Sequence, residues 1–245
     1  MLNRLFFFSD IDDTLIQTKR KTDFGQNTIV AAYTKEGEES SFFYEGVKLL
    51  IDALLKENIT FIPTTARNID SYQRTIFYNE PKIKYAILNF GGTLLVNNEV
   101  DEEWNSIMKQ AYKKIAPLEE VEKNIREVIE KANLNVVVKN IDNYYISIHN
   151  KYNTDNKEYL SNVKSLIEEF LALNDDFYLY ENDNSFGILP HILNKKFAVD
   201  YMIDFHKPLL CLGAGDNLSD LAFMNSTSLH LVPNNSSIHK TRLSH

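Results

Sequence analysis

The chain has 245 residues, of which 44% are hydrophobic and 24% charged, and its formal net charge is −8. This composition is that of a globular protein with a sizeable core, and the acidic balance argues against a nucleic-acid partner, which needs a basic surface. A single cysteine excludes a disulfide within the chain, and no segment approaches the roughly 20 apolar residues that span a bilayer. We therefore expect a cytoplasmic protein without a membrane partner, built as a core with an insertion, and leave its oligomeric state open.

The first third of the chain alternates strand and helix. Residues 4–10, RLFFFSD, form a continuous apolar run that is typical of a strand buried on both faces. Residues 44–59 have apolar side chains at helical spacing, and residues 60–67, TFIPTTAR, predict a second strand. The polar segment before the helix predicts a small hairpin that turns at Glu36 and Gly37. Strand, helix and strand in succession indicate a parallel sheet.

The same alternation continues and then returns near the C-terminus. Residues 71–79 predict a helix, and residues 84–96 predict an apolar strand followed by a Gly-Gly turn. The last part of the chain predicts two helices, at 194–205 and 218–226, and two strands, at 208–216 and 228–234. These segments favour an α/β class with a Rossmann-like parallel sheet.

The middle of the chain breaks this alternation, because a unit of one helix and two strands occurs there twice. The turns of the two hairpins are expected at Asp142–Asn143 and at Asp183–Asn184. Asp and Asn tolerate the left-handed backbone of a tight hairpin turn. We interpret residues 98–186 as an inserted α+β module, a four-stranded antiparallel sheet backed by helices, within a core of residues 1–97 and 187–245.

Three carboxylates follow the first strand within four positions, at Asp10, Asp12 and Asp13. Residues two apart in a strand project to the same side, so Asp10 and Asp12 can face one point while Asp13 turns away. The carboxyl ends of parallel strands are where open α/β sheets bind ligands. Like charges this close raise each other's pKa unless a cation lies between them, and Mg²⁺ prefers oxygen ligands of this kind. The cluster predicts a metal site.

A second acidic segment, GAGDNLSD, follows the predicted strand at 208–216 and carries Asp216 and Asp220. Its glycines allow a tight turn, and spacing by four at a helix start brings both carboxylates to one mouth. Two further polar residues lie at the ends of elements: Thr65 after a strand and Lys195 at a helix start. By itself, each of these residues is more simply explained as a surface or helix-capping residue. They become candidate site residues because of their order along the chain relative to the two acidic segments.

Taken together, the four segments resemble the motifs of the haloacid dehalogenase-like (HAD) phosphohydrolase superfamily, which run in the order DxDxT, Thr or Ser, Lys, and GDxxxD. They read DIDDT at 10–14, TAR at 65–67, KKFAV at 195–199 and GDNLSD at 215–220. The resemblance covers the core segments, and the insert is similar to the large α/β cap of the sugar-phosphate phosphatase branch. That branch includes sucrose-phosphate phosphatase, trehalose-phosphate phosphatase and phosphomannomutase, and Cof-like phosphatases are similar.

The resemblance implies a role for each carboxylate of the site. It makes Asp10 the nucleophile that forms an aspartyl-phosphate, and Asp12 the general acid and then the general base. It implies that Mg²⁺ is held by Asp10, by the backbone carbonyl of Asp12 and by Asp216. Asp220 would support the waters of the metal or Lys195. The implied substrate is a small phosphate ester, most simply a sugar phosphate.

The resemblance also implies which residues bind the substrate. Thr65 and Lys195 would bind the oxygens of the transferred phosphoryl group, and Thr14 would orient the loop beside it. Arg67 is a candidate contact to substrate phosphate or sugar, and equally a solvated arginine at a helix start. Because Lys195 is followed by a second lysine, Lys196, the motif does not decide which of the two enters the site.

The motifs depart from the usual pattern in two further places, and they leave other readings open. Ser219 stands where cap-bearing members often have Asn, and Ala66 stands where Gly is usual. Neither departure removes a charged catalytic group. A phosphomutase would use the same aspartyl-phosphate, and a non-catalytic phosphate-binding protein could keep the fold. A response-regulator receiver has a similar acidic cluster, but such a domain is shorter and has its phosphorylated Asp on a later strand.

Overall fold

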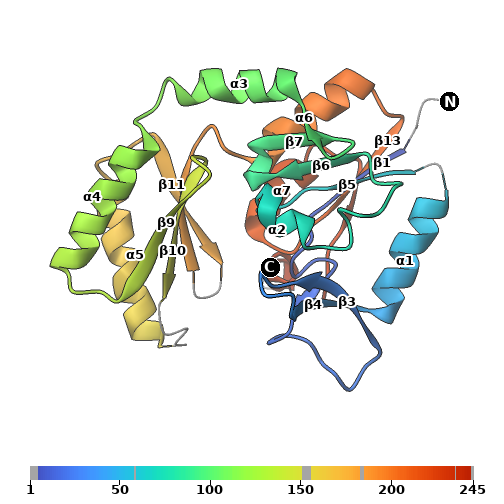
Figure 1. Ribbon diagram of the computed structural model, residues 1–245, viewed down its shortest axis with the longest axis horizontal. Helices are drawn as coiled ribbons and strands as arrows, with labels where there is room; N and C mark the ends of the chain where they lie inside the picture. The colour runs from blue at the N-terminus through green and yellow to red at the C-terminus, as the bar shows by residue number, and fades with distance from the viewer. Residues whose placement is uncertain (1–4, 58, 151–155, 183–184, 235, 244–245) are drawn as a thin grey trace. The chain divides into compact units, whose positions relative to one another are not determined.

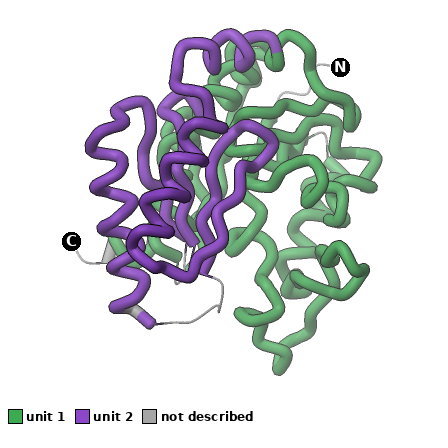
Figure 2. Tube along the Cα trace, turned by 60° about the vertical axis from the view of Figure 1, so that its left-hand side comes forward, with its two compact units in different colours: residues 1–105, 194–245 green, residues 106–193 purple. Residues whose placement is uncertain are grey.

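The structure is a computed structural model that describes residues 5–57, 59–150, 156–182, 185–234 and 236–243 (Figure 1). The chain divides into two compact units (Figure 2). Unit 1 comprises residues 1–105 and 194–245, and unit 2 comprises residues 106–193. The sequence places these boundaries at 97/98 and 186/187, and the division falls eight and seven residues later, at 105/106 and 193/194.

Unit 1 is built on a four-stranded parallel sheet. Its order is β14-β13-β1-β5, with bounds Leu229–Leu231, Leu210–Ala214, Leu5–Ser9 and Ile59–Pro63. The β1 strand lies in the centre, and Phe6, Phe7 and Phe8 are all buried. A run of buried apolar residues without alternation is what a strand covered on both faces requires.

Helices and shorter strands complete unit 1. The helices are α1 (Glu45–Lys56), α2 (Ile69–Gln73), α6 (Lys195–His206), α7 (Leu221–Met224) and α8 (Ser237–Leu243). One antiparallel sheet joins β2 (Gln17–Thr18), β4 (Glu39–Tyr44) and β3 (Thr28–Tyr33). Another joins β6 (Tyr85–Leu88), β7 (Thr93–Val96) and β8 (Glu99–Val100).

One helix of unit 1 is shorter than the sequence predicts. The prediction of helix over residues 71–79 is wrong beyond Gln73, where α2 ends. Thr75 instead forms an isolated bridge with Ala32 of β3, and the backbone N–H of Ile76 donates to the carbonyl of Ala31. Pairing with a neighbouring strand therefore overrides a local helical pattern.

Unit 2 repeats one arrangement, a helix followed by a hairpin. The α3 helix (Glu102–Tyr112) leads into it from unit 1, and its helices α4 (Leu118–Lys131) and α5 (Lys157–Leu171) each precede two strands. The strands form an antiparallel sheet in the order β11-β12-β10-β9, with bounds Phe177–Asn182, Ser185–Pro190, Tyr145–Asn150 and Val136–Ile141. The α/β class with an inserted four-stranded antiparallel module is confirmed.

The two predicted hairpin turns have different outcomes. Asp142 and Asn143 follow β9 with φ angles of 49° and 58°, and they are the central residues of a β-turn that the N–H of Tyr144 closes by donating to the carbonyl of Ile141. Both have the left-handed backbone that Asp and Asn tolerate. The turn expected at Asp183–Asn184 lies outside the described residues. The interior of unit 2 is apolar: Ile125, Ile146 and Ile188 are fully buried between the helices and the sheet.

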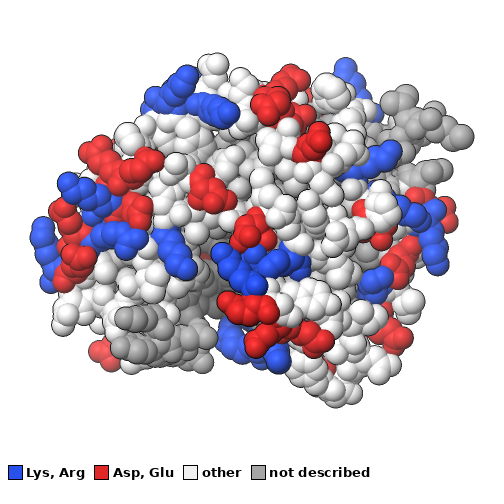
Figure 3. All heavy atoms as spheres, in the orientation of Figure 1, with Lys and Arg blue, Asp and Glu red and all other residues white. Residues whose placement is uncertain are grey.

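The surface carries both signs of charge. On the face shown in Figure 3, acidic and basic side chains are interspersed. Within the described part of the chain, none of the helices combines the length and the apolar character needed to cross a membrane.

Candidate active site

The pairing of three parallel strands brings distant segments to one edge of the sheet. The backbone N–H of Asp10 donates to the carbonyl of Ala214 at 2.9 Å, and the N–H of Thr64 donates to the carbonyl of Ser9 at 2.7 Å. The β13 and β5 strands therefore both end beside the end of β1. The residues that follow the three strands emerge at the same place. All the candidate site residues lie in unit 1.

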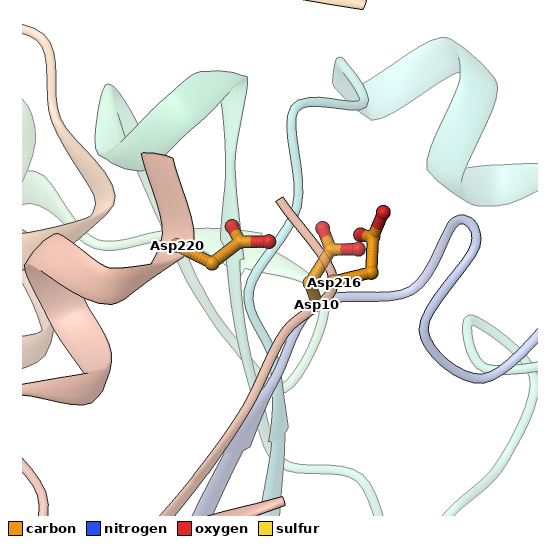
Figure 4. A group of neighbouring side chains, drawn as sticks. All are labelled: Asp10, Asp216 and Asp220. Carbon is orange, nitrogen blue, oxygen red and sulfur yellow. The ribbon is translucent and has the colours of Figure 1, made fainter. Parts of the chain in front are cut away.

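Three carboxylates meet at this edge. Asp10, Asp216 and Asp220 each offer an oxygen within 4.8 Å of the others, and Figure 4 shows Asp220 pointing toward the other two. Gly215 allows this approach, because a Cβ at that position would lie 2.5 Å from the Cβ of Asp220. Asp220 is also fixed by a capping box, in which its carboxylate accepts from the backbone N–H of Asn217.

Lys195 lies among these carboxylates. Its Nζ donates to Oδ1 of Asp10 at 2.7 Å and to Oδ1 of Asp220 at 2.8 Å, and the ring of Phe223 lies 5.7 Å away. Only 7% of Lys195 is exposed. Lys196 instead pairs with Asp200 and donates to the hydroxyl of Ser226. Lys195 is therefore the lysine that reaches the acidic cluster.

The position of Lys195 follows from how α6 begins. Asn194 is the N-cap, and its side chain accepts from the N–H of Lys196 at 2.9 Å, which leaves Lys195 as the first helical residue. The backbone of Asn194 and Lys195 packs directly on Gly91. A Cβ on Gly91 would lie 2.6 Å from the carbonyl oxygen of Asn194, and its φ of 97° also favours glycine.

The burial of Asp10 and Asp216 changes their acidity. Burial raises the pKa of Asp10 well above its usual range; Lys195 opposes this shift, and Asp220, Asp216 and Asp12 add to it. Burial likewise raises the pKa of Asp216 to about 7, with contributions from Asp220 and Asp13. Ionising the cluster is therefore costly unless more positive charge than Lys195 alone is present.

Thr14 links the two acidic segments. Its hydroxyl lies 3.1 Å from Oδ2 of Asp10 and 3.2 Å from Oδ1 of Asp216, and is the donor to both. Asp13 turns away from this group, as its place in the sequence predicts, and forms an ion pair with Lys21 at 2.6 Å. Its φ of 61° marks the turn that separates it from Asp12.

Asp12 stands apart from the buried triad. Both of its carboxylate oxygens accept hydrogen bonds from Arg67, each at 2.7 Å. The sequence treats Arg67 as a candidate substrate contact or a solvated arginine at a helix start, and the structure places it on Asp12. Thr65, two residues before Arg67, is fully buried, and its hydroxyl accepts from the N–H of Arg67 at 3.2 Å.

Sequence reasoning predicts a turn at Gly91–Gly92 but missed that Asn89, Phe90 and Gly91 support the site. All three residues have positive φ, at 50°, 54° and 97°. The turn touches each neighbouring site segment: the N–H of Asn89 donates to the carbonyl of Arg67, that of Phe90 donates to the carbonyl of Thr65, and Gly91 contacts Asn194. The sequence signal was the pair Gly91–Gly92, which predicts a turn without indicating what the turn supports.

This fold and site define a phosphatase of the HAD superfamily. A parallel sheet carries the acidic triad and a lysine at its carboxyl edge, and an α+β unit is inserted between the segments that form the site. The match to known families agrees, since residues 3–243 match the family described as sucrose-6F-phosphate phosphohydrolase. The chain belongs to that family. The response-regulator alternative is thereby excluded.

Solved structures with the same fold are only distantly similar in sequence. The sucrose-phosphatase of Synechocystis sp. PCC6803, solved with sucrose and phosphate, is 13% identical with a TM-score of 0.62, over 98% of this chain and 96% of that one. The C-terminal domain of trehalose-6-phosphate phosphatase from C. albicans is 15% identical with a TM-score of 0.62, over 91% and 74%. An N-terminally truncated, IMP-bound IMP-nucleotidase of Plasmodium falciparum is 17% identical with a TM-score of 0.57, over 98% and 67%. No match is found among curated protein sequences.

Proposed function

We propose that the protein is a Mg²⁺-dependent phosphomonoesterase that acts on a sugar phosphate through an aspartyl-phosphate intermediate. The observation that carries the proposal is the single buried cluster of Asp10, Asp216, Asp220 and Lys195, built from segments that lie far apart in the sequence. Membership of a sugar-phosphate phosphohydrolase family supports the substrate class.

The donor set of the cluster fits a hard divalent cation. Three carboxylates and one ammonium leave two uncompensated negative charges when all four groups are ionised. Carboxylate oxygens are the ligands that Mg²⁺ prefers, and burial of Asp10 and Asp216 makes a counter-charge necessary. We assign the metal to Asp10 and Asp216, with the backbone carbonyl of Asp12 as a further ligand and Asp220 in support. When bound, Mg²⁺ would neutralise charge between nucleophile and phosphate.

The proposed chemistry divides one displacement into two. In the first, an oxygen of Asp10 bonds to phosphorus while the bond from phosphorus to the ester oxygen breaks, and Asp12 gives a proton to the departing alcohol. In the second, Asp12 takes a proton from water, whose oxygen bonds to phosphorus and releases Asp10 and inorganic phosphate. Lys195 and Thr65 bind the phosphoryl oxygens, and Thr14 holds Asp10 in orientation.

The proposed role of unit 2 is that of a cap that binds the part of the substrate beyond its phosphate and so determines specificity. All the candidate catalytic residues belong to unit 1, so the second unit is free of the phosphoryl chemistry. The inserted α+β sheet with its two helices is the part of the chain in which the specificity of the reaction is expected to reside. Closure of such a unit excludes water from phosphoryl transfer.

The proposal is tested by measuring phosphate release from a panel of sugar and nucleotide monophosphates with and without Mg²⁺. Wild-type protein is expected to release phosphate only with the metal, and Asp10→Asn to lower kcat at least a thousandfold, by roughly 4 kcal/mol of barrier, because it removes the nucleophile. Acid quenching of the reaction with ³²P-labelled substrate should trap label that hydroxylamine removes, and this label should be absent from Asp10→Asn.

The same assay distinguishes the proposed phosphatase from the two alternative functions. A phosphomutase would yield an isomerised sugar phosphate and no free phosphate, and its activity would require a bisphosphorylated sugar. A non-catalytic binder would bind phosphate esters without turning any of them over. Full activity of Asp10→Asn would refute the assignment of the nucleophile while leaving the phosphatase activity itself established.

A further inference from the structure

Arg67 makes a two-point contact with Asp12 across 55 residues of sequence. The Nε atom donates to Oδ2 and the Nη2 atom donates to Oδ1, both at 2.7 Å. A guanidinium that binds both oxygens fixes the orientation of the carboxylate as well as its position. The orientation of the Asp12 carboxylate is therefore fixed by Arg67.

Arg67 is itself held in place from several sides. Its backbone N–H donates to the hydroxyl of Thr65 at 3.2 Å, and its carbonyl accepts from the N–H of Asn89 at 2.8 Å. The Nη1 atom donates to the carbonyl of Ser71 in α2 at 3.2 Å. A strand end, a tight turn and a helix thus fix both the backbone and the fork of this side chain, so its contact with Asp12 is preorganised.

The pair is partly shielded from solvent. The side chain of Arg67 is 17% exposed and that of Asp12 is 34% exposed. Burial lowers the pKa of Arg67, but attraction and hydrogen bonding from Asp12 outweigh that effect and raise it above its usual value. Arg67 therefore stays charged and keeps its two hydrogen bonds to Asp12.

The two carboxylates of the DxD segment are thus oriented by different cations. Asp10 is held by Lys195 and Thr14, whereas Asp12 is held by Arg67. Building on the phosphatase function proposed above, we propose that Arg67 is a positioning residue for Asp12, which sets the direction of the carboxylate that transfers protons, and does not bind the substrate itself.

This role makes a specific kinetic prediction. Arg67→Met keeps an unbranched side chain as far as the ε position but removes the guanidinium, so Asp12 gains rotational freedom. Misplacement of a reacting group by about 1 Å can cost about a hundredfold in rate, so kcat is expected to fall ten- to a hundredfold for phenyl phosphate, a poor leaving group. The loss should be smaller for 4-nitrophenyl phosphate, whose leaving group needs little protonation, and KM should change little for both.

A double-mutant cycle decides whether Arg67 acts through Asp12. In the Asp12→Asn background, Arg67→Met is expected to have almost no further effect on kcat, because the group it positions is already lost. Arg67→Lys, which keeps the charge without the fork, should recover part of the activity. Arg74→Met is the matched control. Arg74 pairs with Asp70 of α2, the helix whose Ser71 carbonyl accepts from Arg67, and its replacement should leave kcat unchanged.

The pairing also has a readout that does not depend on activity. The Nε–H proton of Arg67 should give a slowly exchanging NMR signal that Asp12→Ala, which removes both acceptor oxygens, abolishes and Arg74→Met preserves. Persistence of that signal in Asp12→Ala would overturn the pairing. If Arg67→Met does not fold, the Arg67→Lys variant is placed in the same cycle with the same criteria.

Different outcomes separate the failure of this inference from the failure of the proposed function. An increase in KM that is equal in the wild-type and Asp12→Asn backgrounds would show that Arg67 binds substrate directly, and would overturn the positioning role. Equal losses for the two leaving groups would do so as well. A wild-type protein that releases no phosphate from any substrate would refute the phosphatase, and the positioning role in catalysis with it.

Discussion

The two units bury different kinds of side chain. In unit 1, Asp10, Lys195 and Asp220 are each less than a tenth exposed. In unit 2, the buried residues are apolar apart from Ser147, within the part of the chain that the structure describes. Both units have a sheet and helices, so the contrast does not follow from the class of secondary structure.

The contrast shows where this chain buries charged groups although their burial costs stability. A buried ion pair gains little stability over apolar packing, because both charges lose their hydration. Unit 2 avoids that cost and is organised by the contact of helix faces with a sheet. Unit 1 accepts it at one edge of its parallel sheet, beside the ends of β1 and β13, where a reactive carboxylate is needed.

Among the variants that compare the two units, replacement of Lys195 should have the largest effect. Lys195→Met is expected to lower kcat about a thousandfold, because the phosphoryl oxygens and two buried carboxylates lose their cation. Lys196→Met is the matched control, since Lys196 pairs with Asp200 at the surface, and kcat should stay within about threefold of wild type. Steady-state kinetics on both variants, with circular dichroism to verify folding, makes the test. Equal losses of kcat in the two variants would contradict the assignment of Lys195, and not Lys196, to the site.

A truncation in the interior of unit 2 should cost stability. Ile146→Ala is expected to reduce the free energy of unfolding by about 3 kcal/mol, because Ile146 is fully buried and its loss leaves a cavity. Leu173, which is 87% exposed, gives the control, and Leu173→Ala should change stability by less than about 0.5 kcal/mol. Urea unfolding followed by fluorescence measures both. A small effect at Ile146 would contradict the account of unit 2 as a unit held by apolar packing.

Two helix caps give a smaller and more discriminating comparison. Asn156 caps α5 in unit 2 and Asn194 caps α6 in unit 1, and each side chain accepts a backbone N–H near the helix start. Replacing either with Ala should cost about 1 kcal/mol of unfolding free energy. Only Asn194→Ala should also lower kcat, several-fold, because Lys195 is the next residue. Thermal unfolding and kinetics on the pair test this, and an equal kinetic loss in both would count against it.

Much of this arrangement is predictable from sequence because it depends on local pattern. The apolar run that ends at Asp10 predicts a buried strand with a ligand site at its end, and the Asp142–Asn143 pair predicts a hairpin turn that the structure contains. The meeting of Asp10 with Asp216 also follows from sequence, once both segments are placed at the carboxyl ends of strands in one parallel sheet.

What the sequence could not supply depends on contacts between distant residues. The early end of α2 depends on Thr75 pairing with Ala32, and a helical pattern in one segment carries no information about that partner. The choice of Lys195 over Lys196 depends on where the cap residue starts the helix, which a single residue of shift would reverse. The contact between Arg67 and Asp12 depends on the directions of two side chains that follow neighbouring strands.

Binding of a divalent cation tests the central claim most directly. Titration of Mn²⁺ into the wild-type protein, followed by electron paramagnetic resonance with Mg²⁺ as competitor, is expected to give one site per chain. Asp216→Asn should weaken that site at least about tenfold, because it removes a ligand of the cluster. Asp52→Asn, which changes an exposed partner of Lys48, should bind as wild type does. A wild-type protein without a divalent site, or an Asp216→Asn protein with undiminished affinity, would contradict the account.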